Sequence, residues 1–361
     1  MHTTKVFFYF LIFLSLSIDS YSQVTDFYDR TLPDSMITEG ISVDGNSLLY
    51  FKNNEYAKAV YPGFTAFGTN NQIDISYKSN SHVFRAGAMY QFVFGQPMRH
   101  TVMPIISYHY TLLKDFKVNI GTISNSSGHH LIQELQGIDQ YLHNPLEYGL
   151  QFQYQPNWMD GDIWINWRNN LAVGDSSQEQ FTQGTRLTFH VIKNKNWGID
   201  LHSTILFYHH GGQIDISDAP VITQINYHAG VELRKNWRKW QFKMAYHYIG
   251  FRNDEDFNDL PWKNGTAHSL IINAEQPFLN LGIGYRTFNQ FYAPFGDQIF
   301  GIYNTYSHQI FDTKKDLITA NARLKLSDNH HFKIQFGADI YYNLVNNQLD
   351  YNYGVMGKFT F

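Results

Sequence analysis

Apolar and polar side chains alternate at every second residue in segment after segment of this chain. Successive side chains on a β-strand point to opposite faces, so each such segment has one apolar face and one polar face. In residues 240–250, Trp240, Phe242 and Met244 share one face, whereas Gln241 and Lys243 lie on the other. The pattern recurs at 162–168, 197–207, 225–234, 278–286, 316–326, 331–342 and 349–361. A helical period fits none of these segments well.

The length and charge of these segments decide between two all-β folds. Most have about ten residues or a few more, which is what a tilted strand needs to cross the apolar band of a membrane. Their polar faces carry Lys, Arg, Asp and His, and each isolated charge buried in a dry β-sandwich core would cost several kcal/mol or more. We therefore predict a transmembrane up-and-down antiparallel β-barrel of about 16 strands, with 14 as the alternative, around a wet lumen.

The composition agrees with a barrel in lipid. Aromatic residues make up 17% of the chain and charged residues 16%, although the mean hydropathy is only −0.36. Many rings without overall hydrophobicity are typical of the aromatic girdles of membrane barrels. A net charge of −4 gives no reason to expect nucleic acid as a partner. The absence of cysteine excludes disulfides, thiolate metal sites and a cysteine nucleophile.

The N-terminus indicates export. Lys5 precedes an apolar run at 6–16, and Ser20 and Ser22 form a small-x-small site, so we expect cleavage between Ser22 and Gln23. The run is shorter than the roughly 20 residues of a spanning helix. The predicted organisation is a signal peptide at 1–22, a periplasmic or plug segment at 23–62, and a barrel at 63–361 in the bacterial outer membrane. Its expected partners are outer-membrane lipid, the barrel-assembly machinery and, as an option, further copies of the chain.

Short turns alternate with longer connections at 124–146, 169–177, 209–221, 252–263 and 289–297. Outer-membrane barrels have this rhythm, with short periplasmic turns and long extracellular loops. About 16 strands counted from residue 63 would nevertheless put the short turns outside if the last strand ends on the periplasmic side. The count therefore leaves open which side carries the long loops.

The chain resembles a group of uncharacterised, porin-like outer-membrane barrel proteins of Bacteroidetes-type Gram-negative bacteria. The resemblance implies the fold and the location, with no established activity. A terminal aromatic residue, Phe361 here, also resembles the C-terminal assembly signal of outer-membrane proteins. The phrases that carry the family resemblance are Asn53–Tyr56, Gly63–Gly68, Gly128–Ile132, Glu147–Gln151, Asp162–Trp167 and Gln178–Phe181.

The connection at 124–146 is the richest in chemistry-bearing residues. Its imidazoles and carboxylates could in principle bind zinc, but their spacing matches no standard site and the HExxH signature is absent. We expect instead a short helix at 131–135 that folds into the barrel mouth as a constriction. The predicted constriction residues are His129, His130, Glu134, Asp139 and His143.

Two kinds of barrel hydrolase find little support in the sequence. A serine hydrolase needs Ser and His together on the lipid-facing surface, whereas Ser203 is expected outside and His202 inside. Asp160 and Asp162 could form a glycosidase pair, yet two carboxylates on one strand face are commonly plain lumen charges. We predict no enzyme, no catalytic residue, no metal and no cofactor.

Our first functional hypothesis is a channel for diffusion of small polar or anionic solutes, oligosaccharides among them. The second is a plugged structural or accessory barrel for secretion, adhesion or envelope assembly, and the third is a barrel enzyme acting on lipid or glycan. The predicted pore-lining residues are Glu147, Asp162, Arg168, Asp200, His202, His228, Glu232, Arg234, Lys243, His247, Arg286, Arg323, Lys325, Lys333, Asp339 and Lys358.

Overall fold

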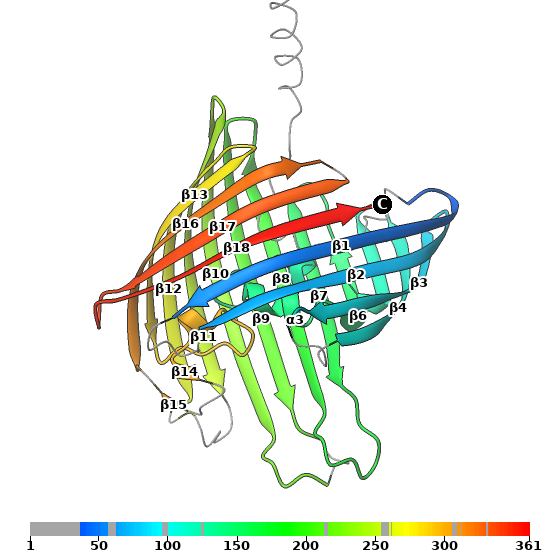
Figure 1. Cartoon of the computed structure of the whole chain (residues 1–361), viewed down its shortest axis with the longest axis horizontal. Coiled ribbons are helices and arrows are strands. Elements are labelled where there is room, and N and C mark those ends of the chain that lie inside the picture. The colour runs from blue at the N-terminus through cyan, green and yellow to red at the C-terminus, as the bar shows by residue number, and fades with distance from the viewer. Residues whose placement is uncertain are drawn as a thin grey trace, which may run out of the picture.

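The computed structural model shows a closed antiparallel barrel of 16 strands, which confirms the predicted fold class (Figure 1). It describes residues 37–361 apart from 57–62, 96–99, 124–125, 213–215, 254–259, 261, 305–308, 311 and 330. The expected signal peptide lies outside the described residues. No helix in the described part of the chain is long and apolar enough to cross a membrane.

Each strand of the wall pairs with its neighbours in sequence, and the first strand pairs with the last. The wall strands are β1 (Gly40–Glu55), β2 (Phe64–Ser79), β3 (His82–Val93), β4 (His100–Leu113), β5 (Phe116–Ile123), β6 (Glu147–Tyr154), β7 (Met159–Asn169), β8 (Gln180–Lys193), β9 (Trp197–His210), β10 (Ile222–Trp237), β11 (Trp240–Asn253), β12 (Asn264–Glu275), β13 (Leu279–Asn289), β16 (Lys314–Asp328), β17 (Phe332–Asn343) and β18 (Gln348–Thr360).

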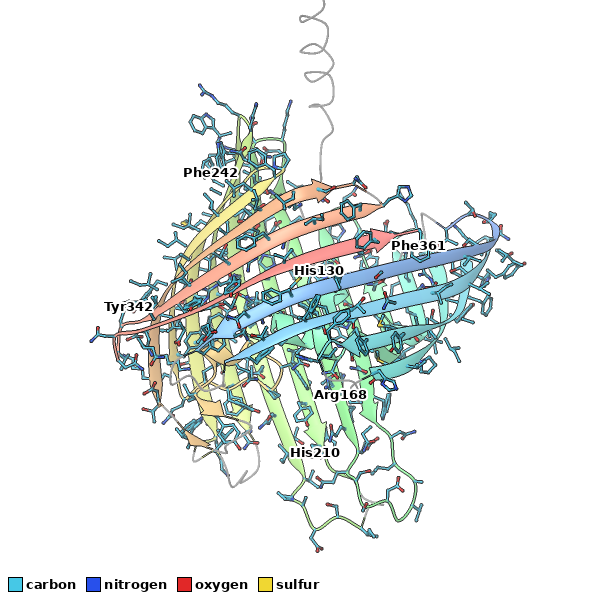
Figure 2. The ribbon with its side chains drawn as sticks, viewed as in Figure 1. His130, Arg168, His210, Phe242, Tyr342 and Phe361 are labelled. Atoms are coloured by element: carbon cyan, nitrogen blue, oxygen red, sulfur yellow. The ribbon has the colours of Figure 1, made fainter. Side chains whose placement is uncertain are left out.

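The predicted alternation sets the two faces of the wall. On β11, Phe242, Met244 and Tyr246 are exposed on the outside, whereas Lys243 and His247 are buried inside. Phe242, Tyr342 and Phe361 project outward near the rims in Figure 2. The apolar side of the strands therefore covers the outside, where lipid contacts it, and the ionic side encloses the lumen.

The wall begins earlier than the sequence predicted. Residues 40–55 lie within the range 23–62 that we expected to form a separate segment, yet β1 pairs with β18 and β2 over most of its length. The sequence of β1 did not predict a strand, because polar residues lie on both of its faces. Ser47 and Asn53 are among those on the outside. Ser47 Oγ donates a hydrogen bond to Asn71 Oδ1 at 2.6 Å, so these outward polar groups satisfy each other.

Adding β1 resolves the question of orientation. The short turns after β2, β4, β6, β8, β10, β12 and β16 all lie at the rim where β1 starts and β18 ends, which we call the turn end. The connections at 124–146, 170–179, 211–221 and 290–313 lie at the opposite rim, which we call the loop end. This is the usual arrangement of outer-membrane barrels, in which the turn end faces the periplasm.

Two connections fold back into the lumen from the loop end. One carries the 3₁₀-helix η1 (Ser126–His129) and the helix α3 (Ile138–His143), and the other carries η2 (Gln298–Phe300), β14 (Tyr303–Asn304) and β15 (Gln309–Ile310). Figure 1 shows α3 inside the barrel, behind β1 and β2. The expected helix at 131–135 is instead a set of turns, and the helical residues follow it after Gly137.

These inserts give the loop end of the lumen a dry core. The first insert packs Tyr141 and Leu142 against Leu48 and Tyr50 of β1. The second insert packs Phe300 and its neighbours against β11, β13 and β17. The residues of this larger cluster are Tyr56, Leu135, Ile249, Phe251, Leu260, Trp262, Ala267, Phe288, Phe291, Tyr292, Ala293, Ile299, Phe300, Ile302, Tyr303, Leu317 and Tyr341.

Candidate functional site

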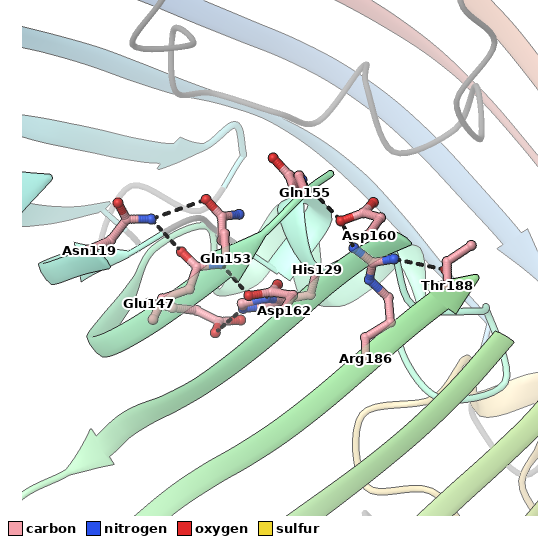
Figure 3. Close-up of polar contacts among 10 residues, drawn as sticks. Asn119, His129, Glu147, Gln153, Gln155, Asp160, Asp162, Arg186 and Thr188 are labelled. Carbon is pink, nitrogen blue, oxygen red and sulfur yellow. Dashed lines mark hydrogen bonds and ion pairs between the residues drawn. The ribbon is translucent and has the colours of Figure 1, made fainter. Parts of the chain in front are cut away.

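A buried histidine between two carboxylates is the centre of the candidate site. His129 is 1% exposed. Its Nδ1 lies 2.6 Å from Asp162 Oδ2, and its Nε2 lies 3.2 Å from Glu147 Oε2. η1 carries the imidazole down onto the inner faces of β6 and β7, which supply the two carboxylates (Figure 3).

Amide side chains hold Asp162, and an arginine holds the nearby Asp160. Gln151 Nε2 donates to Asp162 Oδ1 at 2.9 Å, and Asn119 Nδ2 donates to Gln151 Oε1 at the same distance. Further along β7, Asp160 pairs with Arg186 at 3.0 Å (Figure 3). The pair of carboxylates that we considered for a glycosidase is therefore divided between two networks, because Asp162 faces His129 and Asp160 faces Arg186.

The imidazole lies flat on an aromatic platform. The rings of His129 and Trp164 are stacked with centroids 3.7 Å apart and planes within 10°. The other side of the indole is pressed against β8 at Gly184, where a Cβ would collide with the ring. Only glycine leaves this space, so Gly184 determines how deep Trp164, and with it His129, can sit.

The carboxylates keep the imidazole charged. Burial by itself lowers the pKa of His129, but Asp162 and Glu147 outweigh burial and raise the pKa to about 9. The imidazolium then donates from both ring nitrogens, which matches its two carboxylate partners. At neutral pH the cluster carries a cation held between acceptors, so His129 itself is not a free base.

A small pocket of about 30 Å³ adjoins this cluster near the loop end. Glu147 and Arg168 are its charged groups beside His129, and the guanidinium of Arg168 lies 4.5 Å from the ring centre of Phe295. The hydroxyl groups on its wall are those of Thr182 and Tyr208. Its apolar lining is Leu131, Leu135, Trp164, Leu206, Phe207, Pro294 and Phe295.

Buried ion pairs fasten the first insert to distant strands. Glu134 accepts from Arg286 Nε on β13 at 2.9 Å and from Ser269 Oγ on β12 at 2.6 Å. Burial alone would raise the pKa of Glu134, but Arg286 and its other partners hold the pKa below the usual range. Four strands away from β13 around the barrel, Asp139 of α3 pairs with Lys52 of β1.

Below the inserts, a polar cavity of about 670 Å³ extends to the turn end. It begins at residues 130–138 of the first insert and reaches the turn at 193–195. Four histidines on β8 to β11 line one side, namely His190, His202, His228 and His247. His228 Nε2 lies 2.9 Å from His247 Nδ1. Its charged groups include both members of the pairs Arg186–Asp160, Lys243–Glu275 and Arg323–Asp339.

The predicted site residues are distributed over these two regions. Glu147, Arg168 and His129 line the small pocket, and Asp162 contacts His129 beside it. His143 and Asp139 lie on α3 against β1 and β2. Lys325 and Lys333 pair with Asp328 near the turn end, outside the cavity, and Lys358 lies beside Lys333 in the β17–β18 register. The predicted residues that line the large cavity are His130, Glu134, Asp200, His202, His228, Glu232, Arg234, Lys243, His247, Arg286, Arg323 and Asp339.

Sequence reasoning missed several parts of the site. The pairing of Gly184 with Trp164 and the anchors Lys52 and Ser269 join segments far apart in the chain, and no local pattern reveals such contacts. Among the described residues, no group of three or more His, Cys, Asp or Glu could hold a metal ion. In the His129 cluster the reason is geometric, because its two carboxylates lie on opposite ring nitrogens and cannot converge on one ion.

The fold and the lumen site together define an outer-membrane β-barrel protein with two connections packed inside its wall. The family described as Lipid A 3'-O-deacylase-type matches residues 33–361, which is nearly the whole chain. The chain therefore belongs to the Lipid A 3'-O-deacylase-type family. No curated protein sequence matches it.

Solved outer-membrane barrels share the fold at very low sequence identity. A loop L8 deletion mutant of OmpT of Vibrio cholerae is 10% identical with a TM-score of 0.54, covering 89% of this chain and 99% of that one. OprD of Pseudomonas aeruginosa is 9% identical with a TM-score of 0.52, covering 89% and 94%. OprB of Pseudomonas putida is 5% identical with a TM-score of 0.54, covering 89% and 94%. At such identities the likeness extends to the fold alone.

The family corrects one prediction from the sequence. We expected no enzyme, because no lipid-facing Ser-His pair could be assembled. That expectation is wrong, since the family is described by a lipid A deacylase activity. The error came from treating the lack of an outward Ser-His pair as an argument against any enzyme. The predicted resemblance to an outer-membrane barrel family is confirmed at that level.

Proposed function

We propose that the protein hydrolyses an acyl ester of a lipid A-type glycolipid of the outer membrane. The observation that carries this proposal is the buried Glu147–His129–Asp162 cluster beside a small, largely apolar pocket at the loop end. Family membership supplies the substrate class. The loop end is the rim expected to face the outside, where such lipids reside.

Ester hydrolysis needs a base for water and a donor for the oxyanion. In the proposed reaction, the carboxylate of Glu147 takes a proton from water while the water oxygen bonds to the ester carbonyl carbon. Arg168 donates to the oxyanion that forms. When the intermediate collapses, the bond to the alcohol oxygen breaks, and Glu147 returns the proton to that oxygen. His129 holds the Glu147 side chain in place through Nε2, at 3.2 Å from Oε2.

Three variants test the roles. Glu147→Gln keeps the shape of the side chain and removes the base, so release of fatty acid from purified lipid A in mixed micelles should fall by about 10²–10⁴-fold. Arg168→Met should lower the rate with little change in folding, and His129→Gln should lower it as well. Asp328→Asn, at an exposed ion pair near the turn end, is the matched control. Full activity of Glu147→Gln would rule out this assignment.

A diffusion channel is the second candidate, favoured by the charged cavity of about 670 Å³ that reaches the turn end. Residues 130–138 of the first insert line the loop end of that cavity. Planar-bilayer recordings test the idea, since a steady open current in the intact protein supports a channel. A current that arises only after Glu134 and Arg286 are both replaced supports a plugged barrel instead.

A further inference from the structure

The turn end of the cavity contains a row of polar side chains from neighbouring strands. Gln241 of β11 is opposite Glu275 of β12, Glu275 is opposite Asn280 of β13, and Asn280 is opposite Arg323 of β16. These four strands stand side by side in the wall and line the same cavity. Neighbouring strands are about 4.8 Å apart, so Gln241, Glu275 and Asn280 span roughly 10 Å.

The amide N–H groups of Gln241 and Asn280 donate hydrogen bonds within the protein, whereas their amide oxygens have no partner in the described part of the chain. Gln241 Nε2 donates to Asn236 at 2.8 Å, and Asn280 Nδ2 donates to Glu275 Oε1 at 3.3 Å. Gln241 Oε1 and Asn280 Oδ1 are buried and have no hydrogen-bond partner among the described residues. Asn280 is 8% exposed and Glu275 is 5% exposed. Buried acceptors in native proteins almost always have a partner.

The next row toward the inserts adds two amides that occupy the space beside a glycine. Asn273 and Asn321 stand on either side of Gly282 in the register. A Cβ at Gly282 would run into Asn273 Oδ1 and into the amide of Asn321, so both side chains point into the room that this glycine leaves. We call Gln241, Asn273, Glu275, Asn280 and Asn321 the amide patch.

The charges around the amide patch exclude ionic ligands. Lys243 Nζ lies 3.0 Å from Glu275 Oε2, which opposes a bound cation. Asp339 holds Arg323 at 2.7 Å, so this guanidinium is not free for an anion, and Glu275 repels one. A ligand that supplies hydrogen-bond donors without a net charge satisfies the unpartnered acceptors. Hydroxyl groups do so, and they can also accept from the amide N–H groups.

From this chemistry we propose that the amide patch binds a neutral saccharide that enters from the turn end, the rim expected to face the periplasm. The site stands apart from the His129 cluster and does not depend on the proposed deacylase activity. It lies on β11–β13 and β16 near the turn end, whereas the cluster joins His129 of the first insert to β6 and β7.

Titration calorimetry on the whole barrel in lauryldimethylamine oxide micelles tests this, since that detergent has no sugar headgroup. Cellobiose is the neutral probe, and the disaccharides of glucosamine and of galacturonic acid are its cationic and anionic counterparts. Cellobiose should bind, and the double variant Asn280→Leu with Asn321→Leu should weaken binding at least tenfold. Asn264→Leu, at an exposed position on β12, should bind like the parent.

Gly282→Ala is the second test if the double variant fails to fold. Its methyl group displaces the amides of Asn273 and Asn321 and should weaken binding too. The proposal is overturned if cellobiose gives no binding, which would mean that the amides contact water only. It is also overturned if either charged disaccharide binds as well as cellobiose, or if the folded variants bind like the parent.

Discussion

The two ends of the lumen solve the problem of enclosed polar groups in different ways. At the loop end, the inserts and the wall fill the space with apolar side chains such as Phe288 and Phe300, both 0% exposed, and charges such as Glu134 and Arg286 are paired. At the turn end, the wall strands carry charged side chains around an open cavity. The same strands can thus enclose a packed apolar core at one end and a polar cavity at the other. The difference depends on which connections fold into the lumen. The dry end favours chemistry on a lipid, and the wet end favours polar ligands.

The sharpest test of this contrast compares one residue from each end. Phe300→Ala should lower the free energy of unfolding by about 3–5 kcal/mol, because it opens a hole in a closely packed core. Asn273→Ala faces the cavity, so water replaces the amide and the change should stay within about 0.5 kcal/mol. Urea unfolding in detergent measures both. Equal losses at the two positions would mean that the loop end is no drier than the turn end.

The boundary between the two ends is the ion pair of Arg286 with Glu134. Arg286→Met leaves a carboxylate buried without its cation and should cost about 3 kcal/mol, the lower end for such pairs because the cavity lets water reach the arginine side. Adding Glu134→Gln should restore part of the loss. A double variant no more stable than the single one would show that the pair does not hold the insert.

The charge of His129 makes the dry end sensitive to alkaline pH. Its pKa in the folded state is raised to about 9, above the unfolded value of about 6.5. The stabilisation is therefore full below about pH 6.5 and is lost as the pH rises through about 9. It amounts to about 3 kcal/mol at most. Unfolding midpoints between pH 6 and 10 should fall in the parent and stay flatter in His129→Gln. If the midpoints of the parent and of His129→Gln changed with pH in parallel, His129 would not be charged in the folded protein.

The smallest effect concerns the platform beneath His129. Gly184→Ala forces the indole of Trp164 away from β8, which should cost about 1–2 kcal/mol by overpacking. It should also alter the pH dependence of the unfolding midpoint, because the imidazole moves with the indole. Gly357→Ala on β18 is the control, since its added methyl group makes only ordinary contact with Phe359. Identical pH profiles for Gly184→Ala and the parent would show that the position of Trp164 does not affect the charge of His129.

Much of the wall was predictable because the alternation rule is local. The inward positions of Lys243 and Asp339 follow from their neighbours alone, as does the outward position of Phe242. β1 was not predictable in the same way, because Asn46, Lys52 and Asn54 face inward while Ser47 and Asn53 face outward, so neither face is uniformly apolar.

The candidate site was predictable only as a loop rich in histidine and carboxylate. Alternation tells that Asp162 and Trp164 face inward, but it does not tell which of their many inward neighbours they meet. The contacts of His129 with β6 and β7, and of Glu134 with β12 and β13, depend on how the insert packs across the barrel. That packing joins residues more than a hundred positions apart, where local sequence carries no signal.

The seam between β1 and β18 has a consequence for biogenesis. Phe361 donates its N–H to the carbonyl of Gly45 and accepts from the N–H of Gly45, at 2.9 and 2.8 Å. Until the final strand arrives, β1 presents an unmatched row of backbone donors and acceptors, which hydrocarbon cannot solvate. Insertion into lipid should therefore be all-or-none, and a polypeptide that lacks its last strand should accumulate outside the bilayer.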